Sequence, residues 1–345
     1  MSSSKAGPLL LVPVVSIALL VLRVLTGTLQ AQTAPLVRAV GPIAITVSDL
    51  TRSVEFYTHV LDFKEISETS AGGAAYDRLE GLHGVRERTA LLALGSEQIL
   101  LTQYEAPVGR VFPSDSHSND RWFQHLAIIT SDMDRAYARL QADHVRSAST
   151  SPQRLPDSNP NAAGIRAFYF RDPDGHYLET LQFPPDKGDP KWHVANGALF
   201  LGIDHTAIVV HDTDASLAFY RDQLGFHVAG VSENYGIEQE RLNNVPGAHL
   251  RITTMRAASG PGIEFLQYLQ PSDGRAIPPD EQPDDLVYWQ TTLVTSDLNA
   301  AGASLLQSGA FFVSNGIAVL RAQPDERAVV VRDPDGHALE LLQRP

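Results

Sequence analysis

The sequence predicts an α+β protein in which four βαβββ modules form two tandem domains behind a separate N-terminal segment. Three observations lead to this prediction: one long motif occurs twice, one hexapeptide occurs twice unchanged, and a strand–aspartate–helix pattern occurs at four points. The 345 residues agree with two domains at roughly 150 residues per domain. With 43% hydrophobic and 19% charged residues, the chain can bury a core and lacks the composition of a disordered protein.

Two motifs recur along the chain at almost the same distance. The pattern V-x-D-x3-S-x2-F-Y-x3-L-x-F occupies residues 47–63 and again residues 210–226, an offset of 163 residues. The hexapeptide R-D-P-D-G-H stands at residues 171–176 and, unchanged, at residues 332–337, an offset of 161 residues. A nearly constant offset indicates that one structural unit has been repeated.

The repeat predicts the domain organisation. In chain order the predicted segments are an N-terminal segment 1–34, a first domain 38–187, a linker 188–199 and a second domain 200–345. The linker continues a stretch rich in proline, glycine and aspartate that begins at Pro184, and this composition is typical of a connection between domains.

Each domain divides again, because the strand–aspartate–helix pattern occurs twice within it. The four segments are alternating apolar runs that end in an aspartate, namely Ile43–Asp49, Leu126–Asp132, Thr206–Asp212 and Thr291–Asp297. An aspartate in this place can accept hydrogen bonds from the free amides of the first helical turn. After each helix, alternating runs predict further strands, such as residues 89–94, 98–104, 263–268 and 328–332.

The first 34 residues differ from the rest of the chain. They contain Lys5 and Arg23 but no acidic residue, and residues 9–22 are almost wholly apolar. A basic start, a short apolar run and the sequence Leu29–Ala31 predict a secretory signal peptide, and hence export to the periplasm or the extracellular space. An uncleaved membrane anchor that tethers the protein is the alternative, although the run is short for a full membrane span.

The charge and the composition exclude several classes of function. The formal net charge of −13 repels phosphate backbones, so nucleic acid is not expected as a partner. The absence of cysteine removes thiolate metal sites, iron–sulfur clusters and cysteine nucleophiles. Any metal must therefore use His, Asp, Glu, Gln or Asn.

We expect a small-molecule substrate and a monomer or homodimer.

Four βαβββ modules, with the motif R-D-P-D-G-H-x-x-E closing each pair, resemble the vicinal oxygen chelate superfamily. That superfamily includes glyoxalase I, methylmalonyl-CoA epimerase, extradiol dioxygenases and bleomycin resistance proteins. The resemblance covers about residues 40–345, and it is specific for the fold rather than for one reaction.

The resemblance implies candidate metal ligands at two places in each module, the start of the first strand and the last strand. The first-strand positions are Pro42, His125, His205 and Gln290. The last-strand positions are Leu100, Glu179, Glu264 and Glu340. Because Pro42 and Leu100 cannot bind a metal, the first module has lost both ligands and only one complete set of four can form.

The membership of this set depends on which modules pair. We expect each domain to build its own site, which gives the set His205, Glu264, Gln290 and Glu340. A site between the domains would instead use the set His125, Glu179, His205 and Glu264.

Nitrogen or amide ligands combined with carboxylates suit one divalent ion, such as Zn, Ni, Co, Mn or Fe. In the enzymes that the chain resembles, the ion binds adjacent substrate oxygens and stabilises an enediolate while a carboxylate moves the neighbouring proton. The resemblance therefore implies a metal-dependent lyase or isomerase, with Glu340 or Glu264 as the base.

Two alternatives stay open on the sequence alone. An extradiol ring-cleaving dioxygenase usually carries a tyrosine three residues before the Asp-Pro turn; that position is Val330 in the second domain and Tyr169 in the first. A protein of the bleomycin-resistance kind would bind a small molecule in the cleft without a metal and without catalysis.

Overall fold

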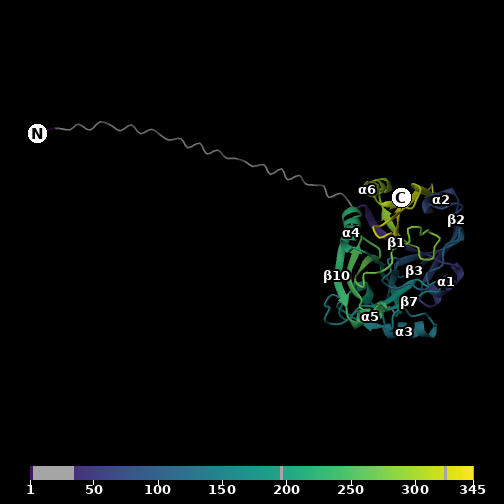
Figure 1. Cartoon of the computed structure of the whole chain (residues 1–345), viewed down its shortest axis with the longest axis horizontal. Coiled ribbons are helices and arrows are strands. Elements are labelled where there is room, and N and C mark those ends of the chain that lie inside the picture. Colours follow the sequence, from purple (N-terminus) through teal and green to yellow (C-terminus); the bar gives the residue numbers. More distant parts are fainter. Residues whose placement is uncertain (3–34, 195–196, 322–324, 345) are drawn as a thin grey trace. The chain divides into compact units, whose positions relative to one another are not determined.

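The computed structural model describes residues 1–2, 35–194, 197–321 and 325–344, and two β-sheets organise the part from residue 35 onward (Figure 1). The predicted signal peptide or anchor, residues 1–34, lies outside the described residues except for its first two positions. Within the described ranges, no helix has the length and apolar character needed to cross a membrane.

The two sheets, sheet A and sheet B, contain all the strands found in the described ranges. Sheet A has the order β14 (Phe311–Phe312), β16 (Glu326–Arg332), β17 (Ala338–Gln343), β13 (Trp289–Thr295), β1 (Val37–Thr46), β4 (Glu97–Ala106), β3 (Arg86–Leu94) and β2 (Lys64–Gly72), with β15 (Ala318–Arg321) beside β16. Sheet B has the order β10 (His227–Tyr235), β11 (His249–Arg256), β12 (Gly262–Gln270), β9 (Phe200–Val209), β5 (Gln124–Thr130), β8 (Tyr177–Gln182), β7 (Arg166–Arg171) and β6 (Gln153–Arg154).

Helices connect these strands in the predicted βαβββ order, so the α+β fold class is confirmed. The helices are α1 (Leu50–His59), α2 (Ala74–Glu80), α3 (Met133–Ala142), α4 (Thr213–Leu217) continued by a π-helical segment η2 (Ala218–Gln223), α5 (Ile237–Asn243) and α6 (Leu298–Gln307). A short 3-10 helix, η1 (Pro190–His193), lies in the predicted linker. The short helices α2 and α5, which follow β2 and β10, were not predicted.

The two central strands of each sheet come from different halves of the chain. β1 runs antiparallel to β13, and β5 runs antiparallel to β9. Sheet A thus joins the first and fourth modules, whereas sheet B joins the second and third. The expectation that each half of the chain builds its own site therefore does not agree with the pairing of the strands. The edge of a first strand can pair with any similar edge, and the local sequence does not select the partner.

Alternation along the central strands separates a packed face from a free face. On β1, Ile43 and Ile45 point into the core that contains Leu50 and Tyr57 of α1, while Ala44 and Thr46 line a cavity on the other side. Successive strand residues point to opposite faces of a sheet. The helices α1, α3, η2 and α6 therefore cover one face of the sheets, whereas α2 and α5 help to line the cavities on the other face, where the candidate functional residues lie.

Aspartates at the four predicted positions begin the main helices, and this prediction is confirmed. The four N-caps, whose side chains all accept hydrogen bonds from first-turn amides, are Asp49, Asp132, Asp212 and Asp297. Asp132, for example, accepts from the amides of Asp134 at 3.0 Å and Arg135 at 3.1 Å.

Replacing Asp132 with alanine should lower the free energy of unfolding by about 1 kcal/mol, because two first-turn amides lose their acceptor. Urea denaturation followed by circular dichroism measures the change. Asp186→Ala is the matched control, since Asp186 is exposed and makes no side-chain hydrogen bond to the described part of the chain. An equal loss of stability in both variants would contradict the capping role.

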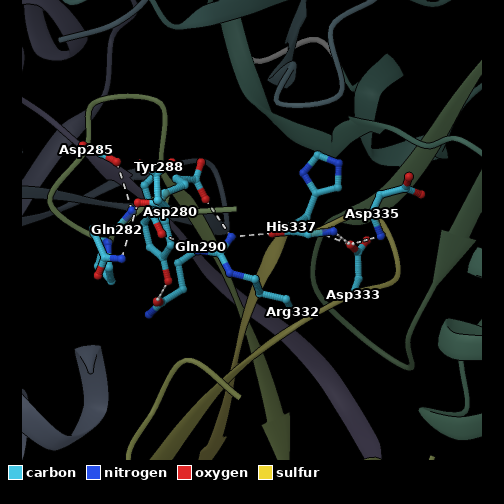
Figure 2. A network of polar contacts seen from close by, with 12 residues as sticks. Asp280, Gln282, Asp285, Tyr288, Gln290, Arg332, Asp333, Asp335 and His337 are labelled. Atoms are coloured by element: carbon cyan, nitrogen blue, oxygen red, sulfur yellow. Dashed lines mark hydrogen bonds and ion pairs between the residues drawn. The ribbon is translucent and has the colours of Figure 1, made fainter. Parts of the chain in front are cut away.

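The two repeated motifs contact each other in the folded protein. The Tyr57 hydroxyl donates to Asp172 at 3.4 Å, and the Tyr220 hydroxyl donates to Asp333 at 3.1 Å. Asp333 in turn accepts from the three backbone amides of residues 335–337, which closes the predicted turn (Figure 2). His337 is buried, and its Nε2 lies 2.9 Å from the Val209 carbonyl oxygen. The hexapeptide is thus a structural turn that links the two sheets.

Candidate metal centre

Two histidines lie on the free face of sheet B, one on each central strand. His125 belongs to β5 and His205 to β9. The antiparallel register places Ala207 opposite His125 and Ala127 opposite His205. Because each histidine faces an alanine across the strand pair, space remains between the two rings, whose centroids are 5.9 Å apart.

Two glutamates flank this pair on the neighbouring strands. Glu179 of β8 lies beside Ala127, and Glu264 of β12 lies beside Ala207. Each row across the sheet therefore contains one histidine, one alanine and one glutamate. The second and third modules each contribute one histidine and one glutamate, so the site has an approximate twofold arrangement. Neither half of the chain carries all four residues.

The four side chains approach one another closely. Glu179 Oε2 lies 3.2 Å from His125 Nε2 and 4.0 Å from His205 Nε2, and Glu264 Oε1 lies 3.5 Å from His205 Nε2. One donor atom from each of His125, Glu179 and His205 lies within 4.8 Å of the other two. Within the described ranges, no other group of three His, Cys, Asp or Glu residues meets this criterion.

The imidazole rings have buried nitrogen atoms without hydrogen-bond partners. His125 is 1% exposed and His205 is 3% exposed, and neither nitrogen of His125 nor Nε2 of His205 is hydrogen-bonded to a described residue. A buried polar atom without a partner destabilises a protein. A divalent ion bound by the nitrogen lone pairs would satisfy them, and the carboxylates would balance its charge. The residues present therefore fit a metal ion.

The carboxylates around His205 favour positive charge at its Nε2 atom. Burial by itself would lower the pKa of His205, but the negative charges of Glu264 and Asp204 raise that pKa to about 9. The Nδ1 atom donates to Asp204 at 2.9 Å, so Nε2 is the atom that faces the glutamates. A proton or a metal ion at Nε2 would provide the positive charge that this environment attracts.

Asp204 holds the ring of His205 in place, and it is not among the residues predicted from the sequence. Its carboxylate also accepts from Arg256 at 2.8 Å and from the Trp192 indole at 3.1 Å. Burial would raise the pKa of Asp204, but its interactions with His205 and Arg256 hold the pKa well below the usual range. The available sequence signal was the position of Asp204 directly before His205. Its other two partners come from distant elements.

Replacing Asp204 with asparagine should weaken metal binding about 10- to 100-fold, because the carboxylate fixes the orientation of His205 and increases the basicity of its ring. Calorimetric titration with Zn, Ni or Co measures the affinity. Asp222→Asn is the control, since Asp222 is an exposed residue paired with Arg221. An unchanged affinity in Asp204→Asn would contradict the positioning role.

A cavity of about 640 Å³ opens above this group, and it is lined by Glu179, His205 and Glu264. His205 is the sole histidine among the described residues that line it. Tyr169 also lines the cavity, and its ring centroid is 4.9 Å from that of His125. A small molecule in this space would therefore reach both carboxylates.

Gln290 and Glu340, which the sequence analysis grouped with His205 and Glu264, lie on sheet A. Gln290 is on β13 and Glu340 is on β17, whereas His205 and Glu264 are on sheet B. The favoured set of four is therefore not brought together, because β13 pairs with β1 rather than joining β9 in one sheet. The residues that the structure does bring together are those of the alternative set.

On sheet A, the row that corresponds to a histidine–alanine–glutamate row of sheet B contains Gln290, Ala44 and Leu100. Ala44 of β1 is in register with both Leu100 and Gln290. Sheet A thus repeats the geometry of sheet B, but it has no histidine at the equivalent places.

Comparison with protein families identifies two matching segments. The family model described as Glyoxalase/Bleomycin resistance protein/Dioxygenase superfamily matches residues 39–180 and residues 202–341. These two segments contain well over half of the chain, and each includes two of the βαβββ modules.

Curated relatives carry three different activities. The chain is 35% identical over 152 residues to a 2-epi-5-epi-valiolone epimerase from Actinomyces sp., covering 42% of this chain and 80% of the relative. It is 26% identical to catechol-2,3-dioxygenase from Bacillus subtilis, covering 55% of this chain and 66% of the relative. It is 29% identical to lactoylglutathione lyase from Schizosaccharomyces pombe, covering 55% of this chain and 60% of the relative.

Solved structures support the fold. A mutant of glyoxalase I from Zea mays superimposes with a TM-score of 0.57 at 15% identity, covering 89% of this chain and 92% of that chain. The unmutated maize structure gives a TM-score of 0.54 at 15% identity with the same coverage. At this identity the similarity concerns the fold alone.

Proposed function

The chain belongs to the glyoxalase/bleomycin resistance protein/dioxygenase superfamily, and from that membership we propose that sheet B binds one divalent metal ion and catalyses proton transfer next to a substrate carbonyl, as a lyase or isomerase. One observation carries the proposal: two histidines and two glutamates from two halves of the chain meet on the free face of sheet B, and three of these four residues line its cavity. Those residues are His125, Glu179, His205 and Glu264. The epimerase and lyase relatives support this reaction class.

His125, Glu179 and His205 are the residues that would hold the ion, because their donor atoms already cluster within 4.8 Å of one another. When bound, the ion would polarise a carbonyl oxygen and stabilise the negative charge that develops there. The proposed substrate is therefore a small molecule with two neighbouring oxygens, at least one of them a carbonyl oxygen. Zn, Ni, Co, Mn and Fe are the ions that this set of donors suits.

Glu264 is the residue proposed to move the proton. Its side chain is 17% exposed, compared with 5% for Glu179, so Glu264 is the more accessible carboxylate. Its Oε2 accepts a hydrogen bond from Thr254 at 2.7 Å, which fixes the direction of the carboxylate. A general base must reach the proton that it removes. Glu264 would take a proton from the carbon beside the carbonyl and return it to the product.

A ring-cleaving dioxygenase is the second candidate, and the position of Tyr169 favours it. Two histidines and one carboxylate are also the ligands of non-haem Fe(II) oxygenases, and Tyr169 lies beside His125. The dioxygenase relative is consistent with this reading. However, Glu264 adds a second carboxylate close to the histidines. We therefore place proton transfer first.

Metal analysis of the purified protein tests the proposal. After reconstitution with Ni, Co, Mn, Zn or Fe, elemental analysis should find about one ion per chain, because sheet A lacks the histidines of sheet B. Two tightly bound ions per chain, or none, would contradict the proposal, and the absence of any ion would favour a binding protein. Oxygen uptake with catechol as the probe would support the dioxygenase instead.

Export to the periplasm or the extracellular space remains a prediction from the N-terminal sequence, and so does the monomeric or homodimeric state. Both are independent of the reaction proposed for sheet B.

A further inference from the structure

Sheet A carries a second cavity, on the face that corresponds to the metal site of sheet B. Its volume is about 330 Å³, and β1, β3, β4, β13, β17 and α2 contribute to its wall. Four glutamates line it: Glu326 pairs with Arg344, and the other three are Glu80, Glu87 and Glu340. None of its described lining residues is a histidine. The cavity is therefore acidic and differs chemically from its counterpart.

Glu80, the last residue of α2, places an unpartnered oxygen in this cavity. The residue is 6% exposed, and its Oε2 has no hydrogen-bond partner among the described residues. Burial, followed by the negative charges of Glu87 and Glu340, raises the pKa of Glu80 well above its usual range, and a hydrogen bond with Tyr104 opposes this effect only in part. The protein thus leaves an acceptor in the cavity for which it provides no donor.

Glu87 is a second buried carboxylate in the same space. It is 6% exposed, and no described residue donates a hydrogen bond to its side chain. Burial and the nearby charge of Glu340 raise the pKa of Glu87 to about 7. Burying two ionised carboxylates without a cation beside them destabilises the folded protein. A positively charged group placed between them would offset much of this destabilisation.

Glu340 is held in a fixed orientation at the other side of the cavity. Its Oε2 accepts hydrogen bonds from Gln290 and Thr292, both at 3.2 Å. Gln290 is itself fixed by the Tyr288 hydroxyl, which donates to Gln290 Oε1 at 2.9 Å (Figure 2). The second oxygen of Glu340 is left available to a ligand.

Two of these acids have no counterpart in sheet B, although the two sheets share one architecture. Glu80 ends the seven-residue helix α2, and Asn243 ends the equivalent seven-residue helix α5. Glu87 holds the place on β3 that Leu250 holds on β11, each opposite a tyrosine of the next strand. Their acidity is therefore a property of this cavity and not of the repeated fold.

The protein itself does not neutralise this cluster. Of the described residues that line the cavity, Arg344 alone is cationic, and it pairs with Glu326 at 3.4 Å. The three glutamates also do not converge as metal ligands do, since their oxygens do not all lie within 4.8 Å of one another. A cation larger than a metal ion fits this spacing better.

The rest of the wall suits an organic cation. Tyrosine rings can contact an ammonium group through their faces, and aliphatic side chains can contact an apolar body. Residues of both kinds line the cavity: Tyr76, Tyr104, Tyr288, Leu79, Leu91 and Leu100.

We propose that the sheet A cavity binds a small organic ammonium ion with an apolar body, and that Glu80, Glu87 and Glu340 face its positive charge. This site is additional to the proton-transfer site of sheet B and uses none of its residues.

Calorimetric titration of the full-length protein with benzylammonium, and separately with benzyl alcohol, tests the proposal. The two probes have nearly the same shape, but only benzylammonium is charged at neutral pH. We expect benzylammonium to bind at least about tenfold more tightly than the alcohol, because hydrogen bonds between charged groups are stronger than neutral ones. Equal affinity for the two probes, or no binding of benzylammonium at millimolar concentration, would overturn the proposal.

Variants locate the binding in this cavity. Glu80→Gln and Glu87→Gln should each weaken benzylammonium binding about tenfold or more, since each keeps the side-chain shape and removes a group that ionises to a carboxylate beside a bound cation. Glu55→Gln, at an exposed glutamate of α1, should leave the affinity unchanged. His205→Ala should also leave it unchanged, which separates this site from the function proposed for sheet B. Wild-type affinity in both Glu80→Gln and Glu87→Gln would refute the assignment.

Discussion

Alanine in place of His125 is expected to lower the affinity for a divalent metal by more than about 100-fold, because the cost of losing a ligand exceeds the 10- to 100-fold cost of losing a residue that only orients one. His125 and His205 are the nitrogen donors of the cluster in sheet B, and no other histidine among the described residues belongs to such a cluster. Calorimetric titration with Zn, Ni and Co, supported by elemental analysis, measures the loss.

Gln290→Ala is the decisive comparison for this first prediction. If the second half of the chain built the site alone, Gln290 would be a metal ligand and His125 would not. Because Gln290 lies on sheet A, its replacement should leave metal affinity unchanged. Weaker metal binding in Gln290→Ala together with wild-type binding in His125→Ala would contradict the pairing of modules described above.

Replacing Glu264 with glutamine is expected to slow the reaction about 10²- to 10⁴-fold, the usual contribution of a general base, because an amide cannot take up the proton. Metal affinity should change far less, since Glu264 lies outside the tight group formed by His125, Glu179 and His205. The measurement is the exchange of hydrogen for deuterium at the carbon beside the carbonyl, followed by nuclear magnetic resonance across a panel of small α-hydroxyketones in heavy water.

A control and a contrary outcome make this second prediction specific. Glu55→Gln changes an exposed glutamate of α1 in the same way and should keep the wild-type rate of exchange. If exchange continues at the wild-type rate in Glu264→Gln while metal remains bound, Glu264 is not the base. Glu179, the other carboxylate at the histidines, would then be the residue to test.

The two sheets show how one architecture can present different chemistry. Both place the ends of central and flanking strands beside one cavity, but sheet B has histidines where sheet A has Pro42 and Gln290. In sheet A, the buried acidic residues Glu80 and Glu87 line the cavity instead. The fold determines where side chains meet, and the residues at those places determine which ligand they suit.

Local patterns were sufficient to predict the modules. Each capping aspartate satisfies amides within its own first turn, and the alternation of apolar residues depends only on the geometry of one strand. The resemblance to the vicinal oxygen chelate superfamily also implied the strand positions of His125, Glu179, His205 and Glu264, one module at a time.

The sequence by itself therefore determined the α+β class and the four modules, and its resemblance to a known superfamily implied the individual candidate ligands. The tertiary structure alone decided which of those ligands meet, because the first strands of all four modules have similar edges and the choice between partners depends on the packing of the whole chain. For the same reason Asp204, Glu80 and Glu87 could not be found in advance. Their roles arise from contacts with distant elements, such as Arg256 of β11 for Asp204 and the cavity wall of sheet A for the two glutamates.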